Sequence, residues 1–165
     1  MIYYPTKNGN KLLSEPNYAG NIIVILANLP DFLRTPILKK RMLEYFEMPE
    51  PDKKQLINNA LEAAPTIPFL NFSKLFKTWL KILTVLPEDQ RVGLFSAYMS
   101  EISENPQKLI AFYLDGILEV FLSLDNDEQE IISQSVKKII NSFDNEKKRK
   151  LFVIIPDNAQ KHLGF

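Results

Sequence analysis

The sequence predicts an all-α protein built of stacked antiparallel αα-hairpins, and three observations support this fold class. A residue that starts helices returns every 19 residues along most of the chain. Apolar residues within each 19-residue unit recur at spacings of three and four, which is the signature of an amphipathic helix. Apolar-rich units alternate with leaner ones, so that two units form a 38-residue hairpin repeat. The alternative is a compact irregular helical bundle whose helices happen to be equal in length.

The repeating residue is proline in five units and aspartate in the two units that follow. These residues are Pro30, Pro49, Pro68, Pro87, Pro106, Asp125 and Asp144. Proline suits the first helical position because its missing N–H has no partner there, and aspartate caps a helix start. Each unit is therefore expected to form one helix of about 14 residues, ~20 Å long, followed by a short turn.

One face of each predicted helix is apolar. Counted from the residue before each proline or aspartate, the ninth position holds Ile37, Leu56, Leu75, Leu94, Tyr113, Ile132 and Leu151. The tenth, thirteenth and seventeenth positions fall on the same side of a helix and are mostly apolar, so this face is expected to form the core. The eleventh and fifteenth positions, which include Asp115 and Glu119, are largely polar and are expected to face water.

The pattern also predicts domain boundaries. Residues 1–15 have no periodicity and are expected to form an irregular leader, and residues 16–165 a single helical-repeat domain. A degenerate first copy is expected near Pro16, with its inner face formed by Tyr18, Ile22, Ile23 and Leu26. The apolar run IIVILA is far shorter than the ~20 residues that cross a bilayer, and no signal-peptide order precedes it. These features predict a soluble, cytoplasmic protein.

The period and pattern over residues 16–155 resemble the helical-repeat class that includes HEAT, armadillo and tetratricopeptide arrays. The tryptophan, glycine and tyrosine spacing of tetratricopeptide repeats is absent. The resemblance implies an α-solenoid-like stack of hairpins, whose extended surface binds other proteins.

The composition argues against several chemistries. There is no cysteine and one histidine, His162, so thiolate catalysis and transition-metal binding are not expected. His162 is expected near the end of a last short helix, with Gly164 as its C-cap. The five glycines form neither a phosphate loop nor a dinucleotide fingerprint. We therefore predict no catalytic residues, no metal and no cofactor, and a protein that is not an enzyme.

Charge is distributed unevenly along the chain, although the formal net charge is zero. Residues 82–136 carry two basic and ten acidic residues, whereas the segments before and after them each carry a net charge of +4. An acidic middle suits a basic protein partner and disfavours nucleic acid. The candidate partner surface consists of Glu101, Glu104, Asp115, Glu119, Asp127 and Glu128. The leading hypothesis is a non-catalytic protein–protein interaction module with an acidic central stretch.

Aromatic residues gather in the two most apolar predicted helices, 68–85 and 106–123. The alternative function is the binding of a small apolar ligand in a pocket between these helices. The candidate lining residues are Phe72, Phe76, Trp79, Phe112, Tyr113 and Phe121. An aromatic stripe at helical spacing is more often part of a packed core.

The hairpin register makes one pairing prediction. If equivalent helices of neighbouring hairpins lie side by side, Lys77 faces Asp115 and Lys81 faces Glu119, because all four occupy the eleventh or fifteenth position of their units. This two-rung ladder would explain charged residues in the two most apolar helices without invoking catalysis.

Overall fold

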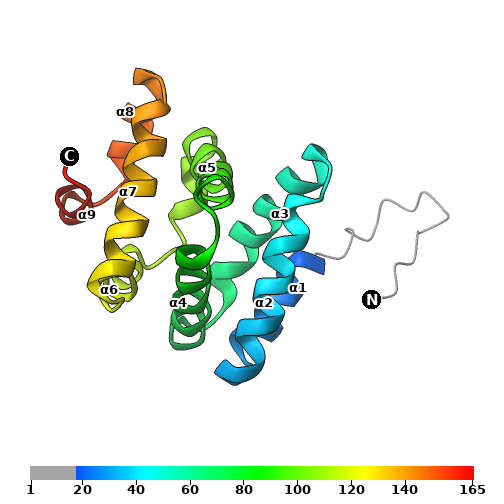
Figure 1. The fold of residues 1–165 in the computed structure, drawn as a ribbon. Helices are drawn as coiled ribbons and strands as arrows, with labels where there is room; N and C mark the ends of the chain where they lie inside the picture. The colour runs from blue at the N-terminus through cyan, green and yellow to red at the C-terminus, as the bar shows by residue number, and fades with distance from the viewer. Residues whose placement is uncertain (1–17) are drawn as a thin grey trace.

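The computed structural model describes residues 18–165; residues 1–17, which include the predicted leader and Pro16, lie outside the described residues. The described part is all-α and contains no strand (Figure 1). Its α-helices are α1 (Tyr18–Ala27), α2 (Asp31–Phe46), α3 (Glu50–Ala63), α4 (Phe69–Val85), α5 (Glu88–Glu104), α6 (Leu114–Leu122), α7 (Asn126–Ser142), α8 (Asn145–Ile154) and α9 (Asp157–His162). The 3-10 helices are η1 (Ala64–Thr66) and η2 (Pro106–Leu109).

Six of the seven predicted start residues, all except Pro106, lie immediately before an α-helix. Each is the N-cap rather than the first helical residue, because its ψ is extended while its carbonyl already accepts a helical hydrogen bond. At Pro30, for example, φ is −60° and ψ 151°, and the Arg34 N–H donates to the Pro30 carbonyl at 2.9 Å. Asp144 caps α8 by accepting the Lys147 N–H at 2.8 Å.

We expect Pro87→Ala to change the free energy of unfolding by no more than about 1 kcal/mol, because this proline mainly stiffens the unfolded chain. Pro87 is exposed and its carbonyl accepts the Arg91 N–H at 3.0 Å, a bond that alanine retains. Urea denaturation followed by circular dichroism measures the change. A loss of several kcal/mol would mean that Pro87 does more than begin α5.

Helices two apart in the chain contact each other through most of the described part. Helix α1 contacts α3, α2 contacts α4, α3 contacts α5, and α5 contacts α7 (Figure 1). Helix α4 packs against both α6 and α7. The short connections between successive helices make sequence neighbours run in roughly opposite directions.

One hydrophobic core runs through these contacts, from Leu26 in α1 to Ile139 in α7. Leu83 and Ile140, both at the seventeenth position of their units, are completely buried. The ninth-position residues are buried in four units, but Ile37 and Tyr113 are 39% and 55% exposed. The predicted inner face is therefore correct at Leu75, Leu94, Ile132 and Leu151. It is partly exposed at Leu56 and fails at Ile37 and Tyr113.

A polar side chain four residues after the N-cap ties several helices to the end of the preceding helix. The donors and carbonyl acceptors are Arg34 to Leu29 (2.9 Å), Arg91 to Leu86 (2.9 Å), Gln129 to Leu124 (2.8 Å) and Gln160 to Ile155 (2.9 Å). Each acceptor is the residue immediately before the N-cap, so these bonds satisfy carbonyls in the connections between helices.

The two arginines among these donors also reach the helix two further on. Arg34 Nε donates to Thr78 Oγ1 at 3.2 Å, and Arg91 Nε donates to Ser135 Oγ at 2.8 Å. Both acceptors lie 44 residues after their arginine. The same relation therefore occurs between α2 and α4 and between α5 and α7.

The predicted single helix over 106–123 is wrong. Pro106 begins η2, and α6 starts only at Leu114. Tertiary packing explains the break, because the chain between the two helices places Phe112 and Tyr113 against the aromatic side chains of α4. Gly116 allows this close approach, since a Cβ there would lie 2.4 Å from Phe69 Cζ and from Tyr113 Cδ1.

Candidate functional site

The predicted acidic surface does not form one continuous patch. Glu101 is only 7% exposed, so its assignment to a partner surface is corrected. Its Oε1 accepts hydrogen bonds from Lys108 Nζ at 2.8 Å and from Asn105 Nδ2 at 3.0 Å, and Lys108 also donates to Asn58. Lys108 of η2 therefore ties this segment to Glu101 of α5 and to Asn58 of α3. Glu104 is exposed, and its Oε2 forms an ion pair with Lys54 Nζ at 3.8 Å.

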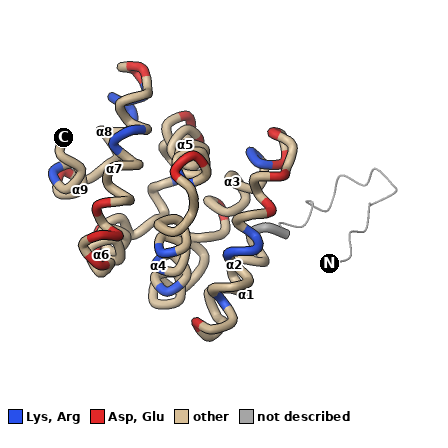
Figure 2. The backbone as a smooth tube through the Cα atoms, in the orientation of Figure 1, with Lys and Arg blue, Asp and Glu red and all other residues tan. Residues whose placement is uncertain are grey.

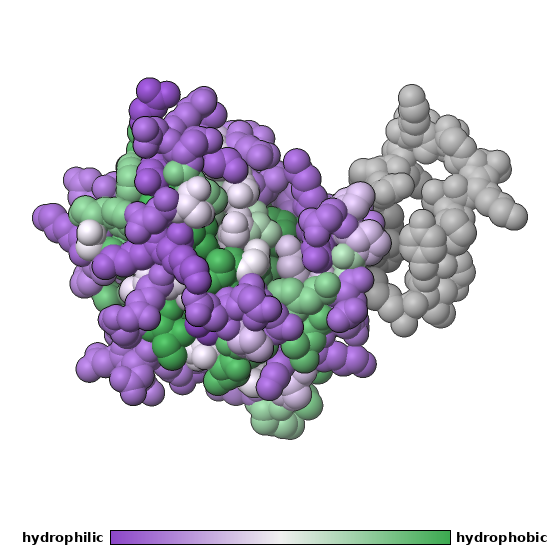
Figure 3. Space-filling model, turned by 45° about the horizontal axis from the view of Figure 1, so that its top comes forward, coloured by the Kyte–Doolittle hydropathy of each residue, from purple (hydrophilic) through white to green (hydrophobic). Residues whose placement is uncertain are grey.

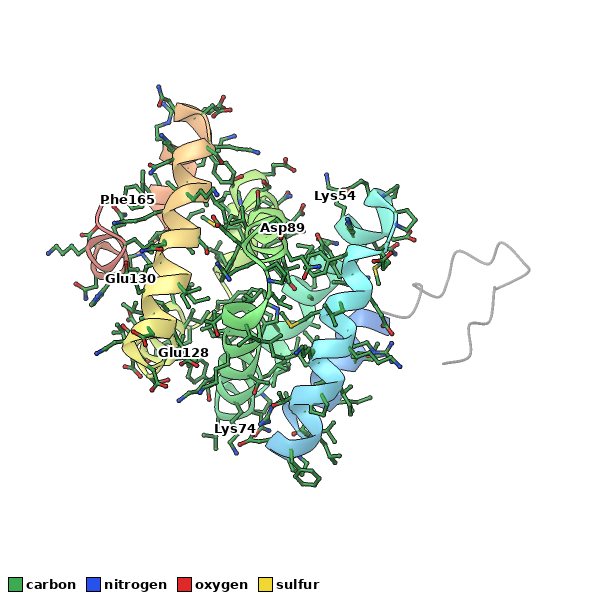
Figure 4. The ribbon with its side chains drawn as sticks, viewed as in Figure 1. Lys54, Lys74, Asp89, Glu128, Glu130 and Phe165 are labelled. Carbon is green, nitrogen blue, oxygen red and sulfur yellow. The ribbon has the colours of Figure 1, made fainter. Side chains whose placement is uncertain are left out.

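The remaining predicted carboxylates belong to α6 and the start of α7. Asp115, Glu119 and Asp127 are exposed, and Glu130 adds a fourth exposed carboxylate close by in the chain. Glu128 is partly exposed and its Oε1 lies 3.5 Å from Lys81 Nζ. Figure 2 shows acidic residues gathered on α6 and the first turns of α7, and Figure 4 labels Glu128 and Glu130 there. These five residues form what we call the acidic face.

Four carboxylates of the acidic face, those of Asp115, Glu119, Asp127 and Glu130, have no cationic nitrogen within 4.0 Å among residues 18–165. Of these four, Glu130 accepts a hydrogen bond from Gln134 Nε2 at 2.7 Å. Asp115 and Glu119 are four residues apart, so they project from the same side of α6. Because they are unpaired and exposed, they are available to a cation from outside the chain.

The predicted lysine ladder between α4 and α6 is wrong. Lys81 pairs with Glu128 of α7 instead of Glu119, and Lys77 Nζ donates to the Ser123 carbonyl at 3.4 Å. The late start of α6 shifts the register, because α4 then meets the α6–α7 connection and α7 as well as α6. Asp115 and Glu119 consequently remain without a partner.

The aromatic residues proposed as a pocket pack against one another. Phe72 stacks on Phe76 with a centroid separation of 5.7 Å, and Phe76 stacks on Trp79 at 5.9 Å. The Phe112 ring meets Phe72 edge-on at 6.0 Å, and Tyr113 meets Phe69 at 5.0 Å. Phe121 is partly buried against the same core. The space between α4 and the 106–123 segment is thus occupied by ring contacts of the kind that stabilise a core.

Trp79 continues this cluster towards α5, where it contacts Phe95 and Tyr98 edge-on. Burial raises the pKa of Tyr98 above its ordinary value, and the nearby Tyr45 raises it further. The Tyr98 hydroxyl is therefore neutral at physiological pH and contributes packing rather than charge.

A groove of about 470 Å³ lies between the α2–α3 corner and α5. Tyr45 and Glu50 line one side, and Asp89 and Gly93 line the other. Figure 4 labels the lining residue Asp89 on α5 and also Lys54 on α3. The face of the molecule drawn in Figure 3 has apolar and neutral residues among hydrophilic ones. Lys53 Nζ lies 5.4 Å from the centre of the Tyr45 ring and 3.3 Å from Glu50, so a cation already occupies this end.

A second groove, of about 400 Å³ and mostly apolar lining, lies where η2 approaches α8, and we call it the η2 groove. Its lining residues are Pro106, Gln107, Leu109, Ile110, Leu114 and Ile154. Neither groove was predicted from the sequence, because both depend on how distant helices meet. The one local signal was Gly93, a helix-interior glycine whose Cβ position is open.

The structure confirms the predicted end of the last helix, with His162 in its final turn and Gly164 just after it. His162 is exposed at the end of α9, and Gly164 has a φ of +79°. The Phe165 N–H donates to the Gln160 carbonyl at 2.9 Å, which closes a Schellman-type helix end.

Within residues 18–165, no cluster of three or more histidine, aspartate or glutamate side chains could hold a metal ion.

No family model, curated protein or solved structure matches this chain. The proposals below therefore rest on its own residues. Of the helices in residues 18–165, none is both long enough and apolar enough to cross a membrane.

Proposed function

We propose that this protein is a non-catalytic interaction module: an α-solenoid-like stack of helical hairpins whose acidic face binds a basic segment of a cytoplasmic partner protein. The observation that carries the proposal is the group of exposed, unpaired carboxylates of Asp115, Glu119 and Asp127. A partner lysine or arginine would gain an opposite charge there without displacing an internal ion pair.

The contacts between helices two apart and the repeated arginine link support the stacked-hairpin part of the proposal. In such an array each unit buries its apolar face against its neighbours, and the outer positions remain available for recognition. The eleventh and fifteenth positions of α6, Asp115 and Glu119, are outer positions of this kind.

We expect a short fluorescent peptide rich in lysine and arginine to bind the protein in a fluorescence-anisotropy titration, and an acidic peptide of the same length not to bind. The double variant Asp115→Asn/Glu119→Gln should weaken binding by about 3–10-fold, because it removes two opposing charges from the site. Raising the salt concentration should weaken wild-type binding as well.

The matched control is Glu47→Gln/Glu62→Gln, which removes the same charge from two exposed positions elsewhere on the molecule. This control should bind the basic peptide like the wild type. If both double variants weaken binding equally, the attraction is a property of total charge and the acidic face is not the site. If the basic peptide does not bind at all, the proposed partner chemistry is wrong.

A further inference from the structure

The η2 groove is lined by the most exposed large apolar side chain of residues 18–165. This side chain is Ile110, which is 83% exposed. Exposed apolar side chains that gather beside a groove mark interaction surfaces, because covering them releases ordered water.

The groove exists because the fifth repeat unit is interrupted. The predicted helix over 106–123 would have continued through Ile110, but the chain forms η2 and then leaves the helical path until Leu114. Helix α8 therefore meets η2 in place of a full-length helix. Ile110 and Ile154 are left lining a groove that no element of the described chain covers.

The two sides of the groove carry opposite charges. On the α6 side, the lining residue Leu114 is followed by Asp115 and, one turn on, by Glu119. On the α8 side, Lys150 and Lys147 lie one and two turns before Ile154, at spacings of four and seven that share a helix face. Lys150 pairs with Glu146 at 3.4 Å but remains about half exposed. Figure 2 shows the acidic residues of α6 and the basic residues of α8.

We propose that the η2 groove is an interface between two copies of this chain, related by a two-fold axis through the groove. In this arrangement the Ile110 side chains are covered by the apolar lining of the other copy. The acidic α6 of each copy then faces the basic α8 of its partner, and this contact occurs twice. A surface with an apolar centre and opposite charges on its two sides is self-complementary under two-fold rotation.

A second copy fits this surface better than a partner of one charge. An acidic segment that filled the whole groove would complement α8 but be repelled by Asp115 and Glu119. A basic segment bound at the acidic face would be repelled by Lys147 and Lys150 if it extended across the groove to α8. An occupant complements both sides only if it places positive charge against α6 and negative charge against α8. A second copy of this chain, rotated about the two-fold axis, does so with its own α8 and α6.

The inference is independent of the proposed basic partner, although both use Asp115 and Glu119. The second copy and the basic peptide would compete, so the peptide titration is carried out at protein concentrations where the chain is monomeric. Failure of one proposal leaves the other standing, because self-association and peptide binding are measured separately.

We expect sedimentation velocity to show a monomer–dimer equilibrium whose dissociation constant lies in the micromolar range and increases with salt. Ile110→Asp should weaken dimerisation by at least about tenfold, because it places a charge in the apolar centre of the interface. The control Leu70→Asp makes a similar change at a 70% exposed position in α4 and should dimerise like the wild type. A wild type that remains monomeric up to millimolar concentration, or equal effects of the two variants, would overturn the proposal.

A charge-exchange experiment tests the orientation of the two copies. Variant one is Asp115→Lys/Glu119→Lys, and variant two is Lys147→Glu/Lys150→Glu; circular dichroism checks that each remains folded. Each variant alone should be monomeric, because like charges face each other twice. An equimolar mixture should dimerise, because both contacts again join opposite charges. If the mixture does not dimerise although both variants are folded, the two-fold arrangement is wrong.

Discussion

Leu83→Ala is expected to lower the free energy of unfolding by about 3–5 kcal/mol, one of the two largest effects that the structure predicts for a single substitution. Leu83 is completely buried in α4, at the centre of a core that also contains Leu80 and Leu94. Helix α4 packs against α1, α2, α6 and α7, so a cavity here has rigid surroundings on several sides. Removing the side chain therefore loses both transfer energy and packing contacts.

Guanidinium denaturation of the wild type and the variant measures this loss. The matched control is Leu70→Ala, the same chemical change in the same helix at a position that is 70% exposed. We expect the control to change stability by less than about 0.5 kcal/mol. Similar losses for the two variants would show that the buried face of α4 has been misassigned.

Helix starts could be predicted from the sequence because they depend on local chemistry. Proline fixes φ wherever it occurs, and Asp144 accepts a hydrogen bond from a residue three positions along the chain. Six of the seven residues in this periodic series are therefore the N-caps of α-helices in the structure. The buried ninth positions in the middle of the chain followed for a similar reason, since apolar spacing fixes a helix face.

The fifth unit could not be predicted because its conformation depends on distant contacts. Local pattern favours a helix after Pro106, but Phe112 and Tyr113 pack on α4, and Lys108 bonds to Glu101 and Asn58. The periodicity of the sequence does not indicate that Lys108 will form a largely buried ion pair with Glu101, seven residues earlier. The same contact explains why Glu101 was wrongly assigned to the surface.

The polar links between helices were missed for a different reason. They occupy one position of the repeat, four residues after the N-cap, but that position holds Arg34, Arg91 and Gln129 in some units and Lys53 and Phe72 in others. A search for apolar columns overlooks such a position. A mixed column of long polar side chains immediately after helix starts would be the signal to seek, because these side chains can reach back to the preceding helix end.

The other large effect is expected at the best buried of these links. Arg34 is 1% exposed, its Nη1 donates to the Leu29 carbonyl at 2.9 Å, and its Nε donates to Thr78 Oγ1 at 3.2 Å. Its Nη2 donates a hydrogen bond to Oδ1 of the exposed Asp31. The guanidinium thus joins the end of α1, the start of α2 and the middle of α4. Burial lowers the pKa of Arg34, but a guanidinium remains charged at physiological pH.

We expect Arg34→Met to lower the free energy of unfolding by about 2–4 kcal/mol, as measured by urea denaturation. Methionine keeps most of the side-chain volume, but it leaves the Leu29 carbonyl without its charged donor. The loss is partly offset because the cost of burying the guanidinium also disappears. The stability of Arg34→Lys should lie between those of the wild type and Arg34→Met. Lysine keeps the charge, but one ammonium group cannot reproduce the planar geometry that reaches three acceptors.

A double-mutant cycle with Thr78→Val isolates the link between α2 and α4. If the Nε–Oγ1 bond joins the two helices, the two substitutions should be non-additive by about 0.5–1.5 kcal/mol. Asp31→Asn provides the comparison, because Asp31 is exposed and its pair with Arg34 should contribute less than about 1 kcal/mol. Additive effects of Arg34→Met and Thr78→Val would mean that the bond to Thr78 does not couple α2 to α4, and that Arg34 acts through Leu29 and Asp31. The repeated 44-residue relation between Arg91 and Ser135 would then describe similar geometry without a shared energetic role.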